Sequence, residues 1–251
     1  MFATTILTFV LFLGLIASPC WGGGFGNVIA EQKGKNLTVE PDGGSPAFPA
    51  YRIEELAPDE FRVVGFQTTT VNGAPSVTFT GITGNVTAAL GSDGGIINVK
   101  DASITGSLFI KLGPGGSHLV DIVDTSVAKN VKVDGARAAS VDVGYECGTC
   151  AAPGIGCTVD GSFSFKSGGS TSDLTLCNVL FAKNVKVTGK PADEEIILAH
   201  TTIDGSLAIK TRPGMSTISL TEVRTASKFE LPKPSSGTTR LLSADSTFPA
   251  P

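Results

Sequence analysis

The chain is organised around the stretch Thr105-Gly106-Ser107-Leu108-Phe109-Ile110-Lys111, which returns twice with changed letters. The later copies are Asp160-Gly161-Ser162-Phe163-Ser164-Phe165-Lys166 and Asp204-Gly205-Ser206-Leu207-Ala208-Ile209-Lys210. Between them stands a sister segment, Ala128-Lys129-Asn130-Val131-Lys132-Val133, whose letters recur unchanged from Ala182 to Val187. The chain is therefore a repetition of one unit, and this has to be recognised before any strand is assigned.

The units follow one another at a nearly constant spacing. When the glycine of the Gly-Ser pattern is the reference, the intervals are 22 or 23 residues, with one interval of 32. Apolar residues alternate inside each unit, which is the period of a β-strand. A unit this short cannot bury its own apolar face and must stack on its neighbours. The reference positions are Arg62, Gly84, Gly106, Lys129, Gly161, Lys183, Gly205 and Ser227.

This periodicity predicts an all-β, single-domain parallel β-helix, or β-solenoid, of about eight rungs of 22–23 residues. The pattern resembles the parallel β-helices of pectate-lyase-like proteins and of repeat-built bacterial surface and secreted proteins. The resemblance covers about residues 62–248 and rests on period and pattern, because no catalytic signature is matched. We expect a right-handed coil, since the unit is longer than that of the hexapeptide-based left-handed type.

The segments before the repeats differ in composition. Residues 1–23 contain an uncharged apolar run and a small-residue zone, typical of a secretory signal peptide, although no Lys or Arg precedes the run. This run is too short for a stable membrane span, which needs about 20 residues. We interpret residues 24–61 as an N-terminal cap that covers the end of the coil, and residues 62–251 as the β-helix. The protein is expected to be secreted or held at the cell surface.

The charge of the whole chain excludes one class of partner. The formal net charge is −4 and the pI is about 5.2. Because nucleic-acid binding needs a basic footprint, we expect no nucleic-acid partner.

Five lysines fall on outward positions of the first strand in successive units, shifted by two residues from one unit to the next. A straight column of ammonium groups would be repulsive, and the shift lowers that repulsion while one face stays positive. Such a face protects the solenoid against sideways strand pairing. It can also bind a linear anionic polymer such as an acidic or sulfated polysaccharide. The candidate ligand-binding residues are Lys111, Lys132, Lys166, Lys186 and Lys210.

Carboxylates gather on the second strand and at the turn after it. Paired carboxylates can perform glycoside hydrolysis or, with a basic residue, lyase chemistry. The catalytic candidates are Asp121, Asp124, Asp142 and Lys100. Oxygen ligands also suit Ca²⁺, for which Asp101, Asp121 and Asp124 are the candidates. No histidine aligns with these units, so a solvated acidic face without a cofactor is the expectation.

The long interval contains a cysteine-rich insertion at 145–156. In an exported protein, the four cysteines here and just beyond predict two disulfides. The alignment favours Cys177 bonded to Cys147 or Cys150, with Cys157 taking the other. A zinc site with four cysteine ligands is the alternative, although only the first pair has the usual spacing.

The sequence therefore favours a secreted structural or adhesive solenoid whose lysine-lined face binds acidic polysaccharide without catalysis. Two alternatives remain open: a polysaccharide lyase or glycoside hydrolase with an aspartate-lined site, and a module of a self-assembling surface coat.

Overall fold

The structure is a computed structural model that describes residues 26–43, 48–135, 138–144, 156–168, 172–189, 194–211, 216–231 and 239–248. The expected signal peptide at 1–23 lies outside these ranges. The described residues form strands and turns and include no helix, and so no helix among them is long and apolar enough to cross a membrane.

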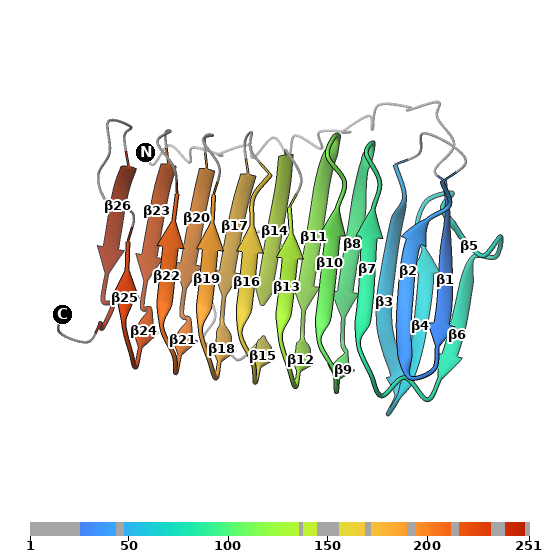
Figure 1. Ribbon diagram of the computed structural model, residues 1–251, viewed down its shortest axis with the longest axis horizontal. Coiled ribbons are helices and arrows are strands. Elements are labelled where there is room, and N and C mark those ends of the chain that lie inside the picture. The colour runs from blue at the N-terminus through green and yellow to red at the C-terminus, as the bar shows by residue number, and fades with distance from the viewer. Residues whose placement is uncertain are drawn as a thin grey trace, which may run out of the picture.

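A parallel β-solenoid forms most of the molecule, as the repeats predict (Figure 1). Each coil gives one strand to each of three sheets, and equivalent strands of successive coils pair in parallel. The third sheet has six strands, so the chain makes about five complete turns from the first of them to the last.

The parallel strands of the first sheet are β7 (Val86–Leu90), β10 (Leu108–Leu112), β13 (Val131–Asp134), β16 (Phe163–Lys166), β19 (Val185–Thr188), β22 (Leu207–Lys210) and β25 (Phe229–Glu230). Those of the second sheet are β8 (Gly94–Lys100), β11 (Ser117–Val123), β14 (Ala138–Gly144), β17 (Ser172–Cys177), β20 (Glu194–Ala199), β23 (Ser216–Thr221) and β26 (Thr239–Ala244). The third sheet contains β9 (Ser103–Ile104), β12 (Thr125–Val127), β15 (Cys157–Val159), β18 (Val179–Phe181), β21 (Thr202–Ile203) and β24 (Arg224–Thr225).

The core lies inside the coils and is made by the alternating apolar residues. On β10, for example, Leu108 and Ile110 are buried, whereas Lys111 is exposed. The same inward positions are filled on each following coil, so apolar side chains stack in columns along the axis. Phe163 and Phe181 pack with ring centroids 5.4 Å apart. Burial of this repeated apolar surface is what drives the coils to stack.

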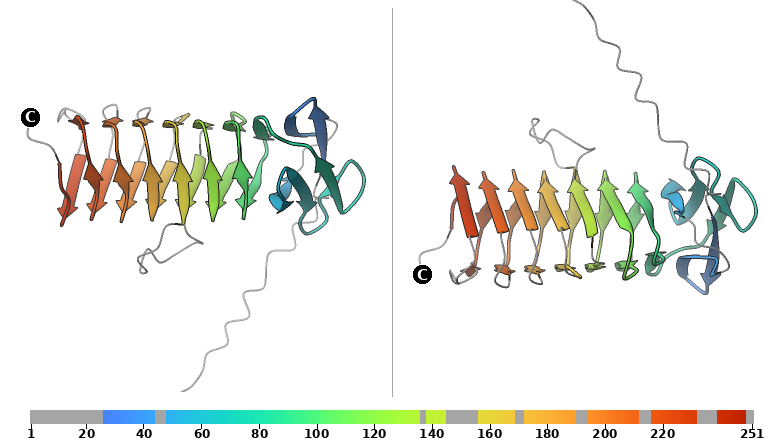
Figure 2. Two further views of the ribbon diagram at one scale, coloured as in Figure 1. Left: turned by 90° about the horizontal axis from the view of Figure 1, so that it is seen from below. Right: turned by 90° about the horizontal axis from the view of Figure 1, so that it is seen from above.

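An N-terminal unit closes one end of the solenoid (Figure 2). Its pairs β1–β2, β3–β4 and β4–β6 are antiparallel, whereas β2 pairs in parallel with β7 and β3 with β8. The rung predicted at Arg62 is therefore wrong: this residue lies on antiparallel β4, and the first coil starts at β7. The strands of the unit are β1 (Asn27–Lys33), β2 (Asn36–Pro41), β3 (Ala50–Ala57), β4 (Glu60–Gly65), β5 (Thr70–Val71) and β6 (Ser76–Thr80).

Among the described residues, no strand of the third sheet lies beyond β9 at this end, and a carboxylate covers the edge of β9 instead. The backbone of β3 is irregular between Glu55 and Ala57. Glu55 accepts a hydrogen bond from the backbone N–H of Ser103 at 2.7 Å and another from the N–H of Asp59 at 3.1 Å. An edge N–H that would otherwise be open to strand pairing is thus occupied.

A ladder of Asn and Ser side chains joins the coils just before the first sheet. The Oδ1 atoms of Asn130 and Asn184 accept hydrogen bonds from the backbone N–H groups of Ser162 and Ser206 on the next coil, each at 2.9 Å. A Cβ atom at Gly205 would stand 2.6 Å from the carbonyl carbon of Lys183 and 2.7 Å from Oδ1 of Asn184, so the close approach of the preceding coil favours glycine here. From Gly106 to Gly205, Gly-Ser coils alternate with Lys-Asn coils, and each glycine follows a coil that carries an Asn.

Candidate functional site

The candidate lysines lie on the outer face of the first sheet, on strands β10, β13, β16, β19 and β22. The strand register divides this face into two outward columns. One column runs through Phe109, Lys132, Ser164, Lys186, Ala208 and Glu230. The other runs through Lys111, Asp134, Lys166, Thr188 and Lys210.

The lysines change column at every coil, and all five are exposed. Two lysines stacked on adjacent rungs, about 4.8 Å apart, would repel by about 0.9 kcal/mol in water. Diagonal neighbours on a sheet face are typically about 7–8 Å apart, which lowers the repulsion to about 0.6 kcal/mol. The stagger thus keeps a positive charge on each coil at a lower electrostatic cost. We call this set the lysine track.

Two acids lie in the same columns. Lys132 pairs with Asp134 at 2.7 Å, and Lys210 lies 3.8 Å from Glu230. Lys111, Lys166 and Lys186 form no ion pair with another described residue. The track therefore offers free ammonium groups on both sides of the Lys132–Asp134 pair.

Phe109 also lies on this face, although the repeat of lysines does not single it out. It is partly exposed and aligns directly with Lys132 on the next coil. Its outward position could have been read from the alternation of β10, because Leu108 and Ile110 on either side point inward. An aromatic ring beside a basic row offers an apolar contact that lysines do not provide.

The aspartate candidates occupy two different places. Asp121 and Asp142 are register partners on the outer face of the second sheet, with Asn98 on the coil before and Thr175 on the coil after. Burial raises the pKa of the Asp142 carboxyl above its ordinary value, and the Asp173 charge adds to this, while a hydrogen bond from Thr175 opposes it. Two carboxylates in adjacent positions, one of which holds its proton more tightly, are a minimal acid–base pair.

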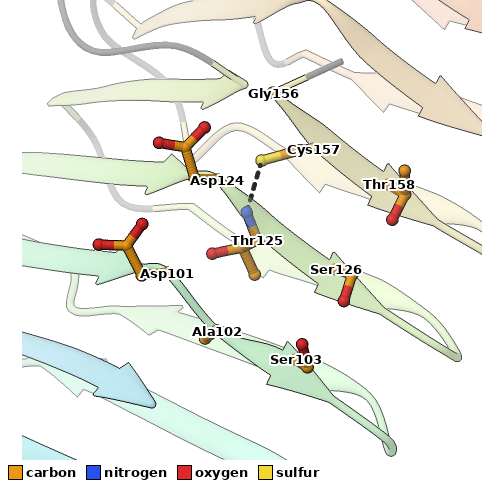
Figure 3. A pocket seen from close by; sticks show the side chains of 9 residues that line it. All are labelled: Asp101, Ala102, Ser103, Asp124, Thr125, Ser126, Gly156, Cys157 and Thr158. Carbon is orange, nitrogen blue, oxygen red and sulfur yellow. Dashed lines mark hydrogen bonds between the residues drawn. The ribbon is translucent and has the colours of Figure 1, made fainter. Parts of the chain in front are cut away.

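Asp124 does not lie on this face, because it follows β11 at the corner between the second and third sheets. Asp101 occupies the same corner one coil earlier, and in Figure 3 the two side chains point to the same side. Lys100 aligns with Val123 and so stands two residues along the strand from the Asp121 column. The four catalytic candidates are thus divided between a sheet face and a corner.

The residues at this corner share a left-handed backbone conformation, which explains why polar residues recur there. Left-handed φ values between 46° and 56° recur at this position, and Asp, Asn and other polar residues serve this turn. The column comprises Asp101, Asp124, Asn178, His200, Glu222 and Asp245. His200 also contacts the Glu222 carboxylate, with Nδ1 and Oε2 2.9 Å apart.

A shallow cavity of about 290 Å³ lies along this corner (Figure 3). It is lined by both corner aspartates and by the hydroxyls of Ser103, Ser126 and Thr158, which align on three successive coils. Within the described ranges, no three His, Cys, Asp or Glu side chains are grouped so that they could hold a metal ion. The calcium candidates Asp101, Asp121 and Asp124 therefore do not form a chelating set.

The disulfide predicted for Cys157 is wrong. This residue is a buried free thiol that donates a hydrogen bond to the carbonyl of Ile122 at 3.3 Å. Burial raises the pKa of the thiol to about 11. Thr125 and Thr201 donate equivalent bonds to the carbonyls of Val99 and Leu176, so the thiol takes the place of a hydroxyl in an internal ladder.

Cys177 is disulfide-bonded. The partners predicted for it, Cys147 and Cys150, lie outside the described residues, as do residues 145–155 of the insertion expected at 145–156. Its pairing stays a prediction. A site with four cysteine ligands that includes Cys157 is contradicted by the hydrogen bond of that thiol inside the coil and by the disulfide of Cys177.

In comparisons with protein-family models, curated proteins and solved structures, none matched this chain.

Proposed function

We propose that the protein is a secreted structural or adhesive rod whose lysine track binds an acidic polysaccharide without cleaving it. The observation that carries the proposal is the lysine track itself: a net-acidic chain presents one exposed ammonium group on each of five consecutive coils of one sheet. A row of like charges on a rigid surface attracts a linear polymer of the opposite charge. A solenoid is suited to this task, because its stacked coils hold the lysines at a regular spacing along one axis.

The test compares two variants of equal charge. Lys166→Gln/Lys186→Gln removes two lysines of the track, and Lys33→Gln/Lys35→Gln removes two exposed lysines of the N-terminal unit. Affinity for an anionic polysaccharide should fall roughly 2- to 30-fold in the first variant, since an exposed ion pair contributes about 0.2–1 kcal/mol. The second variant should bind like the unchanged protein. Equal losses in both variants would show that binding follows net charge and not the track.

A polysaccharide lyase or hydrolase is the second candidate, and the raised pKa of Asp142 beside Asp121 favours it. Incubation with acidic and neutral polysaccharides, with and without Ca²⁺, would release new chain ends if the protein were an enzyme. Activity lost in Asp142→Asn and Asp121→Asn would assign it to this pair. Binding without new chain ends would support the rod. Self-association that is insensitive to the lysine and aspartate changes would instead favour a surface-coat module.

A further inference from the structure

The stagger of the lysine track restricts the shape of a ligand. Within one column, neighbouring lysines such as Lys166 and Lys210 are two coils apart, or about 9.6 Å. Lys186 lies on the coil between them in the other column, about 6.6 Å to the side. The ammonium groups thus alternate between two parallel lines and advance by one coil at each step.

From this arrangement we propose that the track recognises an extended, ribbon-like polyuronate that carries one carboxylate on every sugar. In such a ribbon each sugar is turned over relative to the one before, so successive carboxylates project from opposite edges. One sugar per coil would place each carboxylate over the column that holds the lysine of that coil. This inference rests on the proposed function and adds the shape and charge spacing of the polymer.

The residues between the lysines leave room for the sugar rings. In one column Ser164 separates Lys132 from Lys186, and Ala208 follows Lys186 on the next coil. In the other column Thr188 separates Lys166 from Lys210. These side chains are short and partly exposed. From β16 to β22 the short side chains therefore form a shallow surface, and longer lysine side chains project from alternating sides of it. A flat ribbon lying along the solenoid axis fits this surface.

The aromatic ring of Phe109 offers a contact that favours a sugar over other polyanions. It is partly exposed at the start of the track, in the column of Lys132. The apolar face of a pyranose ring can stack on an exposed aromatic ring, whereas a non-sugar polyanion gains little from it. Phe109 therefore marks the position of one ring of the bound polymer, one coil before the Lys132–Asp134 pair.

A charge-neutral exchange tests the stagger directly. Lys186→Thr/Thr188→Lys keeps the composition of the chain but moves one ammonium group to the other column, so that three lysines stand in a straight line on successive coils. The probes are oligomers of equal length: polymannuronate, which forms a flat ribbon; polyguluronate, which is buckled; hyaluronan, which is charged at every second sugar; and inorganic polyphosphate. Affinities are measured by calorimetry at one ionic strength.

The expected result is that polymannuronate binds the unchanged protein most tightly and that the exchange weakens it by about fivefold, as one misplaced exposed ion pair implies. Polyphosphate, being flexible, should bind both proteins equally. Phe109→Ala should weaken polymannuronate by about 2- to 10-fold and leave polyphosphate unchanged.

Equal affinity for all four polymers, or no effect of the exchange, would overturn the shape inference while leaving polyanion binding intact. Absence of binding to any of them would overturn the proposed function as well.

Discussion

Substitution of Asn184 should weaken the stacking of coils, and the loss in free energy of unfolding can be estimated from its two hydrogen bonds. Its Oδ1 atom accepts the backbone N–H of Ser206 at 2.9 Å and the Ser206 hydroxyl at 2.8 Å. Both bonds are exposed, and a hydrogen bond contributes about 0.5–1.5 kcal/mol, so Asn184→Ala should cost about 1–2 kcal/mol. For a chain of this size the melting temperature should fall by roughly 2–8 °C. Asn184→Ser, which keeps a hydroxyl as Ser107 and Ser162 do, should cost less.

The same contact predicts an interaction between two substitutions. Gly205→Ala would place a Cβ atom 2.6 Å from the carbonyl carbon of Lys183 and 2.7 Å from Oδ1 of Asn184. Overpacking of this kind costs about 1–3 kcal/mol. Asn184→Ala removes the contact with Oδ1 but not the contact with the carbonyl carbon. The double variant should therefore lose less stability than the two single variants lose in sum, by about 0.5 kcal/mol or more. Thermal unfolding of all four proteins gives this difference. Strict additivity, together with a neutral Asn184→Ala, would refute the ladder as the reason for the alternation.

Three further predictions follow from buried groups. Burial lowers the pKa of His118 below 6.5, so the unfolded chain takes up the proton first and the free energy of unfolding should fall as pH drops below about 6.5. Urea titrations of His118→Gln should lack this pH dependence, and those of the corner variant His200→Gln should keep it. The carboxyl of Asp142 has a raised pKa in the folded protein, so its protonation stabilises the folded state at low pH. This contribution to the free energy of unfolding is lost as pH rises from about 3.8. Asp142→Asn should therefore raise the melting temperature at pH 7 but not at pH 3, and a drop at pH 7 would contradict the reasoning. The Cys157 thiol, with a pKa near 11 and 2% exposed, should resist alkylation in the native protein at pH 8 and react in urea, as mass spectrometry would show.

The parts of the fold that could be predicted from the sequence are those fixed by side-chain period and repetition. The inward columns of Leu108 and Ile110 and the stagger of the lysines follow from counting along equivalent units. The strand that carries Arg62 could not be distinguished in this way, because Phe61 and Val63 alternate with it just as residues of a parallel strand do. The period of two is common to parallel and antiparallel strands, and only the hairpin with β3 shows the direction.

The candidate site shows a similar limit. Spacing placed the four cysteines near one another but could not tell a disulfide from a buried thiol that replaces a threonine hydroxyl, as Cys157 does beside Thr125. Spacing also indicates carboxylates at the turn after the second strand, yet the left-handed backbone that all six corner residues share is visible only in the structure. The sequence places Asp121 on the second strand and Asp124 at the turn after it, but only the bend of the chain after β11 shows that the two carboxylates belong to different surfaces.

The alternation of Gly-Ser and Lys-Asn coils has a consequence for how such a rod can change in length. Inserting or deleting one coil would bring two coils of the same kind together, so that an Asn amide would meet a lysine Cβ instead of a glycine, and the lysines on either side would fall into one column. Inserting or deleting two coils would preserve both the Asn–Gly contact and the alternation of the lysines between columns. The repeating unit of this molecule is therefore a pair of coils, and stable engineered variants that differ in length should differ by an even number of coils.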